Sequence, residues 1–338
     1  MKNVEKAASK KISVIIPTYN ASATIRECND SLIAQTIFND LELIFVDDCS
    51  KDNTADILLE YEKQYPDNIC VIRLDANGGP GNARNIAMEY ASGEYIGYVD
   101  ADDAVYPSMY EKLLAEAEST GADIVDTGFY DQSNDTAIIF TSDDLTGRLD
   151  DQMRSRLIIA GGYIWSKIFR HKFLTENNIV FRCEYMLEDM DYLIEAFARA
   201  QVISNVKEIM YVYRSSDGSL SKNKNMYKYI HSQATAMQAI YNRVSSLENY
   251  DGIRDAAEYA MMRLYSYMLN TCMNSVYLKE QPKEAVIPVM ESLKKMKDQV
   301  IHGGYANPYI VKGLSDTDMI AVRANDISAI EALRLQGD

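Results

Sequence analysis

Histidine and cysteine are scarce in this chain of 338 residues. The three histidines lie far apart in the sequence, which leaves little material for a Ser-His-Asp triad or a histidine-rich metal site. The five cysteines are scattered and form no Cys-x-x-Cys pair, so they indicate neither a zinc site nor a disulfide framework and fit a reducing compartment. Any catalytic chemistry must therefore come mainly from carboxylates.

Long apolar runs and positive charge are also in short supply. No segment approaches the roughly 18 apolar residues of a membrane span, and residues 1–11 lack the apolar core of a signal peptide, which predicts a disordered tail on a cytoplasmic protein. The formal charge of −16 argues against a nucleic-acid partner, because such binding depends on Lys and Arg. The same charge opposes an anionic ligand unless a cation or local basic residues offset it.

Short apolar runs alternate with helical spacing over the first hundred or so residues. Strands are expected at 12–17, 41–46, 69–74 and 95–99, with helices at 23–35, 54–65 and 81–91. This alternation predicts an α/β fold whose parallel strands carry ligands at their carboxyl ends. Farther along, the pattern predicts mixed pairing, with a helix at 107–120 and strands at 122–126 and 202–213.

From residue 226 onward the sequence is helical in character. A stripe of methionines and aromatics runs along 253–278 at spacings of three and four, which is typical of a buried helix face. A docking surface for a partner or a membrane is the alternative. The polar loop 214–225 marks the expected domain boundary, giving a tail at 1–11, a catalytic domain at 12–225 and a helical extension at 226–338.

Acidic side chains follow the fourth expected strand at Asp100, Asp102 and Asp103. Carboxylates crowded at one strand end repel one another unless a cation sits among them, and oxygen ligands of this kind suit Mg²⁺ or Mn²⁺. Capping of the next helix by Asp103 is the alternative.

Two further polar segments follow strands. Asp47 and Asp48 end the second strand, where a carboxylate can accept a hydrogen bond from a nucleobase N–H or simply cap a helix. The Gly-rich segment 77–85 opens a helix, and its backbone N–H groups could hold an anion or form a flexible turn. It departs from the dinucleotide-binding fingerprint, because Arg84 occupies the position where that fingerprint has its last Gly or Ala.

In this order the clusters resemble the family-two glycosyltransferases with the GT-A fold, over about Lys11 to Ser221. The resemblance depends on Pro17-Thr18-Tyr19-Asn20-Ala21, Val46-Asp47-Asp48-Cys49-Ser50-x-Asp52-x-Thr54, Asn77-x-Gly79-x-x-x-Ala83-Arg84-Asn85, Asp100-Ala101-Asp102-Asp103 and Glu188-Asp189. Each motif is weak alone, but the ordered set is specific. It implies a Rossmann-like mixed sheet with flanking helices plus a C-terminal helical region, and an inverting, metal-dependent transfer of a sugar.

The resemblance also implies the binding residues. Asp48 would face the base of a UDP-sugar donor, Asp102 would ligate Mn²⁺ or Mg²⁺, and Asp100 would face the ribose or help the metal. The full set implied for the nucleotide-sugar is Pro17, Tyr19, Asn20, Asp48, Asn77, Gly79, Arg84, Asp100, Ala101, Asp102 and Arg214. Arg214 or Lys222, in a flap reaching Ser219-x-Ser221, would approach the leaving phosphates.

The general base implied by the resemblance is Asp189, which would take a proton from an acceptor hydroxyl. Without the other motifs, Glu188, Asp189 and Asp191 would indicate only solvated acids at a helix start. Trp165, Lys167 and Glu188 are implied on the acceptor side. The acceptor would be a saccharide or a lipid-linked saccharide in bacterial surface-polysaccharide synthesis, at the inner face of the membrane, and the C-terminal helices would cover the acceptor, dimerise or touch the membrane.

Two rival classes remain. A GT-A-like nucleotidyltransferase would open with a Gly-rich, Arg-containing loop, whereas this chain has Pro17-Thr18-Tyr19-Asn20 at that point. A non-catalytic nucleotide-sugar-binding or scaffold protein would keep the Asp48 and Asp102 regions and lose the base, so Glu188-Asp189 disfavours it.

Overall fold

The computed structural model describes residues 10–183, 186–214, 225–312, 330–331 and 334. Contacts within the chain divide it into two compact units. The first unit holds Met1–Met153 and Ala160–Ser219, and the second holds Arg154–Ile159 and Leu220–Asp338. Every residue that the sequence assigns to the donor, metal, base or acceptor belongs to the first unit, except Ser221 and Lys222 of the predicted flap, which lie outside the described residues.

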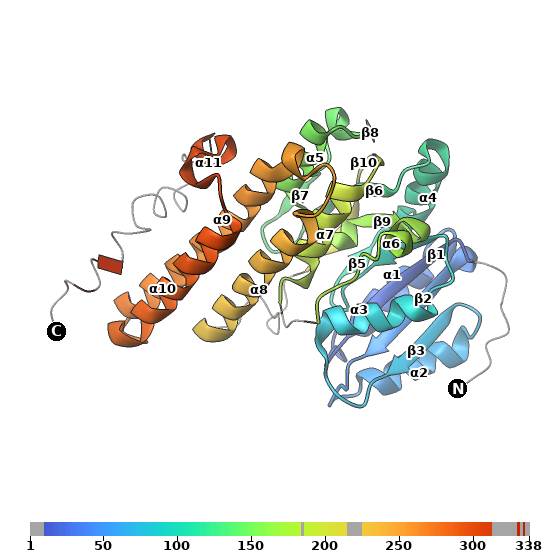
Figure 1. Ribbon diagram of the computed structural model, residues 1–338. Coiled ribbons are helices and arrows are strands. Elements are labelled where there is room, and N and C mark those ends of the chain that lie inside the picture. The colour runs from blue at the N-terminus through green and yellow to red at the C-terminus, as the bar shows by residue number, and fades with distance from the viewer. Residues whose placement is uncertain (1–9, 184–185, 215–224, 313–329, 332–333, 335–338) are drawn as a thin grey trace. The chain divides into compact units, whose positions relative to one another are not determined.

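A mixed sheet runs through the first unit in the order β3-β2-β1-β4-β9-β6-β10-β5 (Figure 1). Its parallel part consists of β1 (Ile12–Thr18), β2 (Leu41–Asp47), β3 (Ile69–Arg73) and β4 (Tyr95–Tyr98). The connecting helices are α1 (Ile25–Ile33), α2 (Thr54–Gln64) and α3 (Gly79–Tyr90). These strands and helices were all predicted, to within two residues at each end.

The other half of the sheet is mixed, as the loosened pattern predicts. Its strands are β5 (Ala104–Val105), β6 (Ile124–Asp131), β7 (Thr136–Ile138), β8 (Gly147–Arg148), β9 (Lys167–Arg170) and β10 (Val202–Tyr213). β9 lies antiparallel to both β4 and β6, whereas β10 is parallel to β6. The helices are α4 (Met109–Thr120), α5 (Asp151–Ala160), α6 (His171–Glu176) and α7 (Glu188–Arg199).

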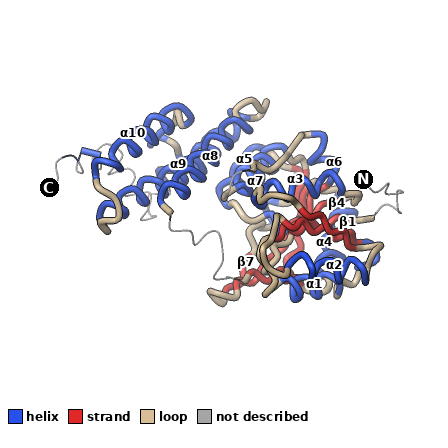
Figure 2. Tube along the Cα trace, turned by 90° about the horizontal axis from the view of Figure 1, so that it is seen from below, coloured by secondary structure: helices blue, strands red, loops and turns tan. Residues whose placement is uncertain are grey.

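The sheet is buried on both sides. Figure 2 shows α3, α6 and α7 on one face and α1, α2 and α4 on the other. Strand positions such as Val14, Ile44 and Ile96 have no exposed surface, as expected for near-continuous apolar runs in a parallel sheet. Helices on both faces leave the strand ends as the exposed part of the sheet.

The carboxyl ends of the parallel strands meet at one edge. Thr18 pairs with Asp47, and Asp47 pairs with Arg73, so β1, β2 and β3 end at the same level. The Asp48 amide continues this ladder by donating to the carbonyl of Thr18 at 2.8 Å. The motif loops after β1 and β2 therefore start side by side.

The start of the chain differs slightly from the predicted tail at 1–11. Lys11 is held by two contacts: its amide donates to the carbonyl of Asp40 at 2.9 Å, and its ammonium pairs with Glu118 at 3.0 Å. Lys10 and Lys11 thus belong to the folded unit, because they extend the first strand. Residues 1–9 lie outside the described residues.

The second unit is helical, as expected. Its long helices are α8 (Met226–Val244), α9 (Tyr250–Tyr277) and α10 (Lys283–Val300), followed by the short α11 (Pro308–Lys312). The three long helices lie side by side, with α9 packed against the other two (Figure 1). Met261, Met262 and Met268 have no exposed surface, so most of the methionine stripe packs in the interior. Within the described part of the chain, no helix combines the length and the apolar character needed to span a bilayer.

Candidate active site

Two loops at the carboxyl edge of the sheet form the predicted nucleotide-binding side. Asn20 joins them: its side-chain oxygen accepts from the Lys51 amide at 2.8 Å, and its own amide donates to the Ser50 hydroxyl at 2.9 Å. Asn20 adopts φ 50° and Cys49 φ 64°, left-handed conformations that non-glycine residues rarely adopt. Tyr19 remains 48% exposed, so its ring is accessible to a flat ligand.

Asp48 fixes the Gly-rich loop. Its two carboxylate oxygens accept from the amides of Gly78 and Gly79 at 2.7 and 2.8 Å, and the Asn77 side chain donates to its carbonyl at 3.2 Å. Gly79 has a φ of 84°, a left-handed conformation that glycine adopts without strain. The amides of this loop do hold an anion, but it is the Asp48 carboxylate of the same chain, so the alternative of a flexible turn is wrong. Each Asp48 oxygen still has a second lone pair for another donor.

Arg84 connects the predicted donor and base sides. Its guanidinium donates to Asp100 at 3.0 Å and to Glu188 at 2.5 Å, and it lies over the ring of Phe181 at 5.3 Å. Arg84 is only 5% exposed. Burial tends to lower the pKa of Arg84, but the carboxylates of Glu188 and Asp100 outweigh it and hold that pKa above its ordinary value. Sequence reasoning placed Arg84 near the donor and Glu188 near the acceptor, and it missed that they form one ion pair.

Asp189 lies at the start of α7, directly after Glu188. Burial raises the pKa of Asp189 to about 7, the negative charge of Glu188 adds to the rise, and Arg84 opposes it. A carboxylate that takes up a proton near neutral pH suits general-base chemistry. The alternative of solvated helix-start acids is excluded for Glu188 and Asp191, which are 6% and 0% exposed, although Asp189 itself is half-buried.

The three carboxylates after β4 have different environments. Asp103 is buried, accepts from the Tyr211 hydroxyl at 2.6 Å and from the Arg214 amide at 2.7 Å, and so does not cap α4. Burial raises the pKa of Asp103 to about 8, and Asp100 adds to the rise. Asp100 and Asp102 are both half-buried, and the Ala101 carbonyl between them accepts from the Thr24 hydroxyl at 3.0 Å. Only Asp100 and Asp102 therefore remain as candidate metal ligands.

A divalent cation fits this donor set in part. Among the residues that the structure describes, no group of three or more His, Cys, Asp or Glu side chains is arranged as a metal site. Asp100 and Asp102 offer carboxylate oxygens, the donors that Mg²⁺ and Mn²⁺ prefer. One or two protein carboxylates are what a cation needs when a diphosphate and water supply its other ligands.

Arg214 does not point at an empty anion site. Its guanidinium donates to Glu27 of α1 at 2.6 Å, with the Arg214 side chain 25% exposed. To contact a diphosphate it would have to exchange this partner. Ser219, Ser221 and Lys222 of the predicted flap lie outside the described residues.

Trp165 and Lys167, which are predicted on the acceptor side, are buried and so are not exposed for direct contact with an acceptor. The Lys167 ammonium pairs with Asp126 at 2.9 Å and has no exposed surface. Trp165 stacks between Tyr163 at 4.6 Å and Tyr211 at 4.3 Å. Asp126 supplies the paired carboxylate that a buried ammonium needs. These side chains therefore belong to the interior, behind the carboxyl edge of the sheet.

Tyr163 is the exposed member of this stack and was missed. It is 40% exposed, and it follows Gly161 and Gly162, which adopt φ 71° and 120°. Burial of part of the ring raises the pKa of Tyr163, and the negative charge of Asp189 adds to the rise, which places the phenol within electrostatic range of the candidate base. The Gly-Gly pair before it was the sequence signal that could have drawn attention to this position.

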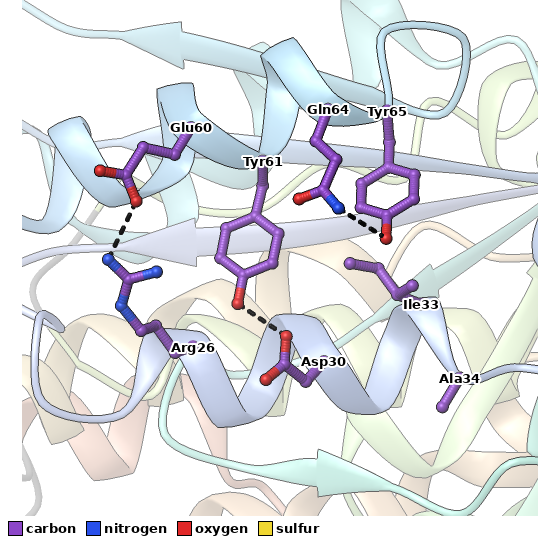
Figure 3. A pocket seen from close by; sticks show the side chains of 8 residues that line it. All are labelled: Arg26, Asp30, Ile33, Ala34, Glu60, Tyr61, Gln64 and Tyr65. Carbon is purple, nitrogen blue, oxygen red and sulfur yellow. Dashed lines mark hydrogen bonds and ion pairs between the residues drawn. The ribbon is translucent and has the colours of Figure 1, made fainter.

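A pocket of about 360 Å³ lies between α1 and α2 and is separate from these residues (Figure 3). None of the predicted site residues lines it. Arg26 pairs with Glu60 at 3.0 Å and Tyr61 donates to Asp30 at 2.6 Å across it, so its polar groups are already paired. We interpret it as a gap between two helices that are joined by these side-chain pairs.

Known proteins match this chain in sequence. A family model described as glycosyl transferase family 2 matches residues 13–179. An uncharacterized glycosyltransferase of Bacillus subtilis, EpsJ, is 34% identical over an alignment of 245 residues that covers 68% of this chain and 70% of the relative. The chain therefore belongs to glycosyl transferase family 2 and is a glycosyltransferase.

Solved structures share its fold. The poly(ribitol-phosphate) beta-N-acetylglucosaminyltransferase TarS of Staphylococcus aureus is 31% identical over an alignment of 220 residues that covers 60% of this chain and 35% of TarS. The structure of TarS 1-349 in complex with UDP matches with a TM-score of 0.70 at 24% identity, covering 96% of this chain and 90% of that chain, and TarS 1-349 is also known with UDP-GlcNAc. The mannosyltransferase PcManGT of Pyrobaculum calidifontis, in complex with GDP-Man and Mn²⁺, matches with a TM-score of 0.54 at 16% identity, covering 95% and 88%. The predicted GT-A fold is confirmed.

Proposed function

We propose that this glycosyltransferase moves a hexosyl group from a UDP-sugar to a hydroxyl of a saccharide or lipid-linked saccharide, with inversion and with a divalent cation. The observation that carries the proposal is the position of Arg84, whose guanidinium contacts Asp100 on one side and Glu188 on the other. Asp100, on the proposed donor side, and the acidic pair Glu188-Asp189 at the start of α7 therefore belong to one site.

The donor side suits a nucleoside diphosphate. Tyr19 offers an exposed ring for the base, and Asp48 has lone pairs left for a base N–H. The solved complexes of TarS with UDP and UDP-GlcNAc support uracil as the base. The remaining donor residues, among them Pro17, Asn77 and Gly79, border the same two loops.

Asp102, with help from Asp100, would hold Mn²⁺ or Mg²⁺, as the Mn²⁺ complex of PcManGT supports. When bound, the cation would stabilise the negative charge that develops on the leaving diphosphate. It would also offset the formal charge of −16, which otherwise repels the donor. Arg214 would add positive charge there after it exchanges Glu27 for the diphosphate.

On the acceptor side, the Asp189 carboxylate takes the proton from the attacking hydroxyl. Glu188 stays paired with Arg84, so it holds the guanidinium and leaves Asp189 as the proton acceptor. Attack opposite the leaving diphosphate inverts the anomeric carbon. The Tyr163 ring is exposed, and the charge of Asp189 contributes to its raised pKa. We therefore assign to Tyr163 the contact with the acceptor sugar that the buried Trp165 and Lys167 cannot make directly.

The acceptor belongs to bacterial surface-polymer synthesis. TarS, by its name, transfers N-acetylglucosamine to poly(ribitol phosphate), and it supports a polymer acceptor of this kind. We propose that the protein acts at the cytoplasmic face of the membrane and that its catalytic domain ends at residue 225. The C-terminal helices would cover the acceptor, pair with a second copy or touch the membrane. A non-catalytic sugar-nucleotide-binding protein is disfavoured because Glu188 and Asp189 are both present and engaged with Arg84.

The test is a panel of UDP-sugars, including UDP-glucose and UDP-GlcNAc, incubated with the full chain in Mn²⁺, Mg²⁺ or EDTA. We expect UDP release from at least one donor in Mn²⁺ and none in EDTA. Asp102→Ala should bind UDP equally weakly with and without Mn²⁺. UDP affinity that is the same in EDTA and in Mn²⁺ for the wild type would rule out the metal role, and failure to bind any UDP-sugar would rule out the donor.

A further inference from the structure

The first turn of α7 needs something to hold it in place. Leu187, directly before Glu188 and Asp189, adopts φ 62° and ψ 23°, a left-handed conformation that a leucine disfavours. Such conformations persist only where surrounding contacts determine them. We propose that Arg182 is a positioning residue that fixes this turn and thereby aims Asp189 at the acceptor hydroxyl. The inference depends on the proposed role of Asp189 as the base.

Arg182 contacts the turn on both sides of Asp189. Its terminal nitrogen donates to the carbonyl of Leu187 at 2.9 Å, two residues before Asp189, and its Nε donates to the carboxylate of Asp191 at 2.7 Å, two residues after it. Asp191 is completely buried and the Arg182 side chain is 13% exposed. A rigid guanidinium that binds a carbonyl and a buried carboxylate together sets the geometry of the segment between them.

The backbone around Arg182 is in turn anchored to α3. The Asn85 side chain accepts from the Phe181 amide at 2.9 Å and donates to the Phe181 carbonyl at 2.8 Å. A Cβ atom on Gly81 would lie 2.0 Å from the Arg182 carbonyl oxygen and 3.1 Å from the Glu188 side chain, so α3 approaches both residues closely. Arg182 therefore connects the helix that opens at the donor side to the helix that carries the base.

Arg84 and Arg182 have different roles in this arrangement. Arg84 holds Glu188 from the donor side, and Arg182 holds the backbone turn from which Asp189 projects. A misplacement of the base by about 1 Å costs up to roughly 100-fold in rate without weakening donor binding. Loss of Arg182 should therefore lower turnover while the donor site stays intact.

The experiment compares Arg182→Ala and Arg182→Lys with Arg199→Ala. Arg199 is the matched control, because it pairs with Glu195 at 2.9 Å on the same helix, at the end away from Asp189. Turnover is measured as UDP release from the UDP-sugar found active in the panel, and donor binding as UDP affinity in Mn²⁺. We expect Arg182→Ala to lose roughly 10- to 100-fold in kcat with donor KM and UDP affinity unchanged. Arg182→Lys keeps the charge but makes fewer bonds, so it should recover part of the rate, and Arg199→Ala should match the wild type.

Thermal unfolding of every variant shows which of them are folded. If Arg182→Ala is not folded, the kcat of Arg182→Lys alone decides whether Arg182 has the positioning role. Folded Arg182 variants with wild-type kcat, or an Arg199→Ala variant that loses as much, would overturn the proposal. A fall in UDP affinity equal to the fall in kcat would also overturn it, because it would indicate general damage. Asp189→Asn separates this from failure of the proposed function: if that variant is inactive while Arg182→Ala is fully active, only the positioning role fails.

Discussion

At the scale of single residues, the site depends on how one buried cation is shared among carboxylates. Asp100 and Glu188 share the single positive charge of Arg84, whereas burial and the charge of Glu188 leave Asp189 with a raised pKa. Two adjacent carboxylates thereby receive different tasks, because one is paired with a guanidinium and the other is left to exchange a proton. A carboxylate whose pKa is raised by burial and by a neighbouring charge is a common mark of an acid–base site.

The raised pKa of Asp189, about 7 against an ordinary 3.8, predicts a pH dependence of catalysis. A base works only when it is deprotonated, so kcat/KM should fall as the pH falls through about 7. Stability should change in the opposite sense: the raised pKa favours the folded state at low pH, and this contribution is lost as the pH rises from the ordinary pKa of 3.8 to about 7. Rates across this range, with urea unfolding of wild type and Asp189→Asn, test both. A rate that does not change between about pH 6 and 8 would contradict the assignment.

Tyr163 predicts an effect on the acceptor alone. Removal of the ring in Tyr163→Ala should raise the acceptor KM by roughly 2- to 10-fold, from the loss of about 0.5–1.5 kcal/mol of stacking. Tyr163→Phe should stay near wild type, and donor KM should not change in either variant. Tyr90→Ala is the control, since Tyr90 is 53% exposed at the end of α3. An unchanged acceptor KM in Tyr163→Ala would remove Tyr163 from the site.

At the scale of helices and strands, the sequence was informative where the apolar pattern is local. The runs that became β1 to β4 end in the motif loops, so both the fold class and the position of Asp48 and Asp100 at the carboxyl edge of the sheet could be predicted. Short strands were missed: β9 has four residues and β5 and β8 have two each, too few for a period to be detected.

Pairings between distant residues could not be predicted at all. Lys167 appears polar in the sequence, and only its partner Asp126, 41 positions away, explains why it is buried. Arg84 and Glu188 are 104 positions apart, so their ion pair is likewise invisible in any local pattern. The motifs predict which residues matter, and the tertiary structure decides which of them are in contact.

The close approach of α3 to the segment before α7 predicts that Gly81 tolerates no side chain. Gly81→Ala would place a Cβ atom 2.0 Å from a backbone oxygen, so the segment has to move, at a cost of about 1–3 kcal/mol in unfolding free energy, and transfer should fall. Gly78→Ala is the control, because its Cβ would meet only the Asn82 side chain at 2.4 Å, which can rotate away. Urea unfolding and turnover of both variants are the measurements. Equal behaviour of the two would show that the contact does not constrain the site.

At the scale of the whole molecule, the first unit carries every described residue assigned to the donor, cation, base and acceptor. The second unit has a core of its own, built on the buried methionines of α9. The chain has a formal charge of −16, and it is proposed to bind a doubly charged nucleotide leaving group, so local positive charge has to be concentrated at the site. In the proposed site the cation supplies it, together with Arg214 once that side chain has exchanged Glu27 for the diphosphate.

The most direct test of this account measures transfer and UDP binding on the same preparation of Asp189→Asn. If Asp189 is the base of a site that shares Arg84 with the donor side, transfer should fall by roughly 10²- to 10⁴-fold while UDP affinity in Mn²⁺ stays within a factor of about two. Transfer at the wild-type rate by this variant would contradict the account.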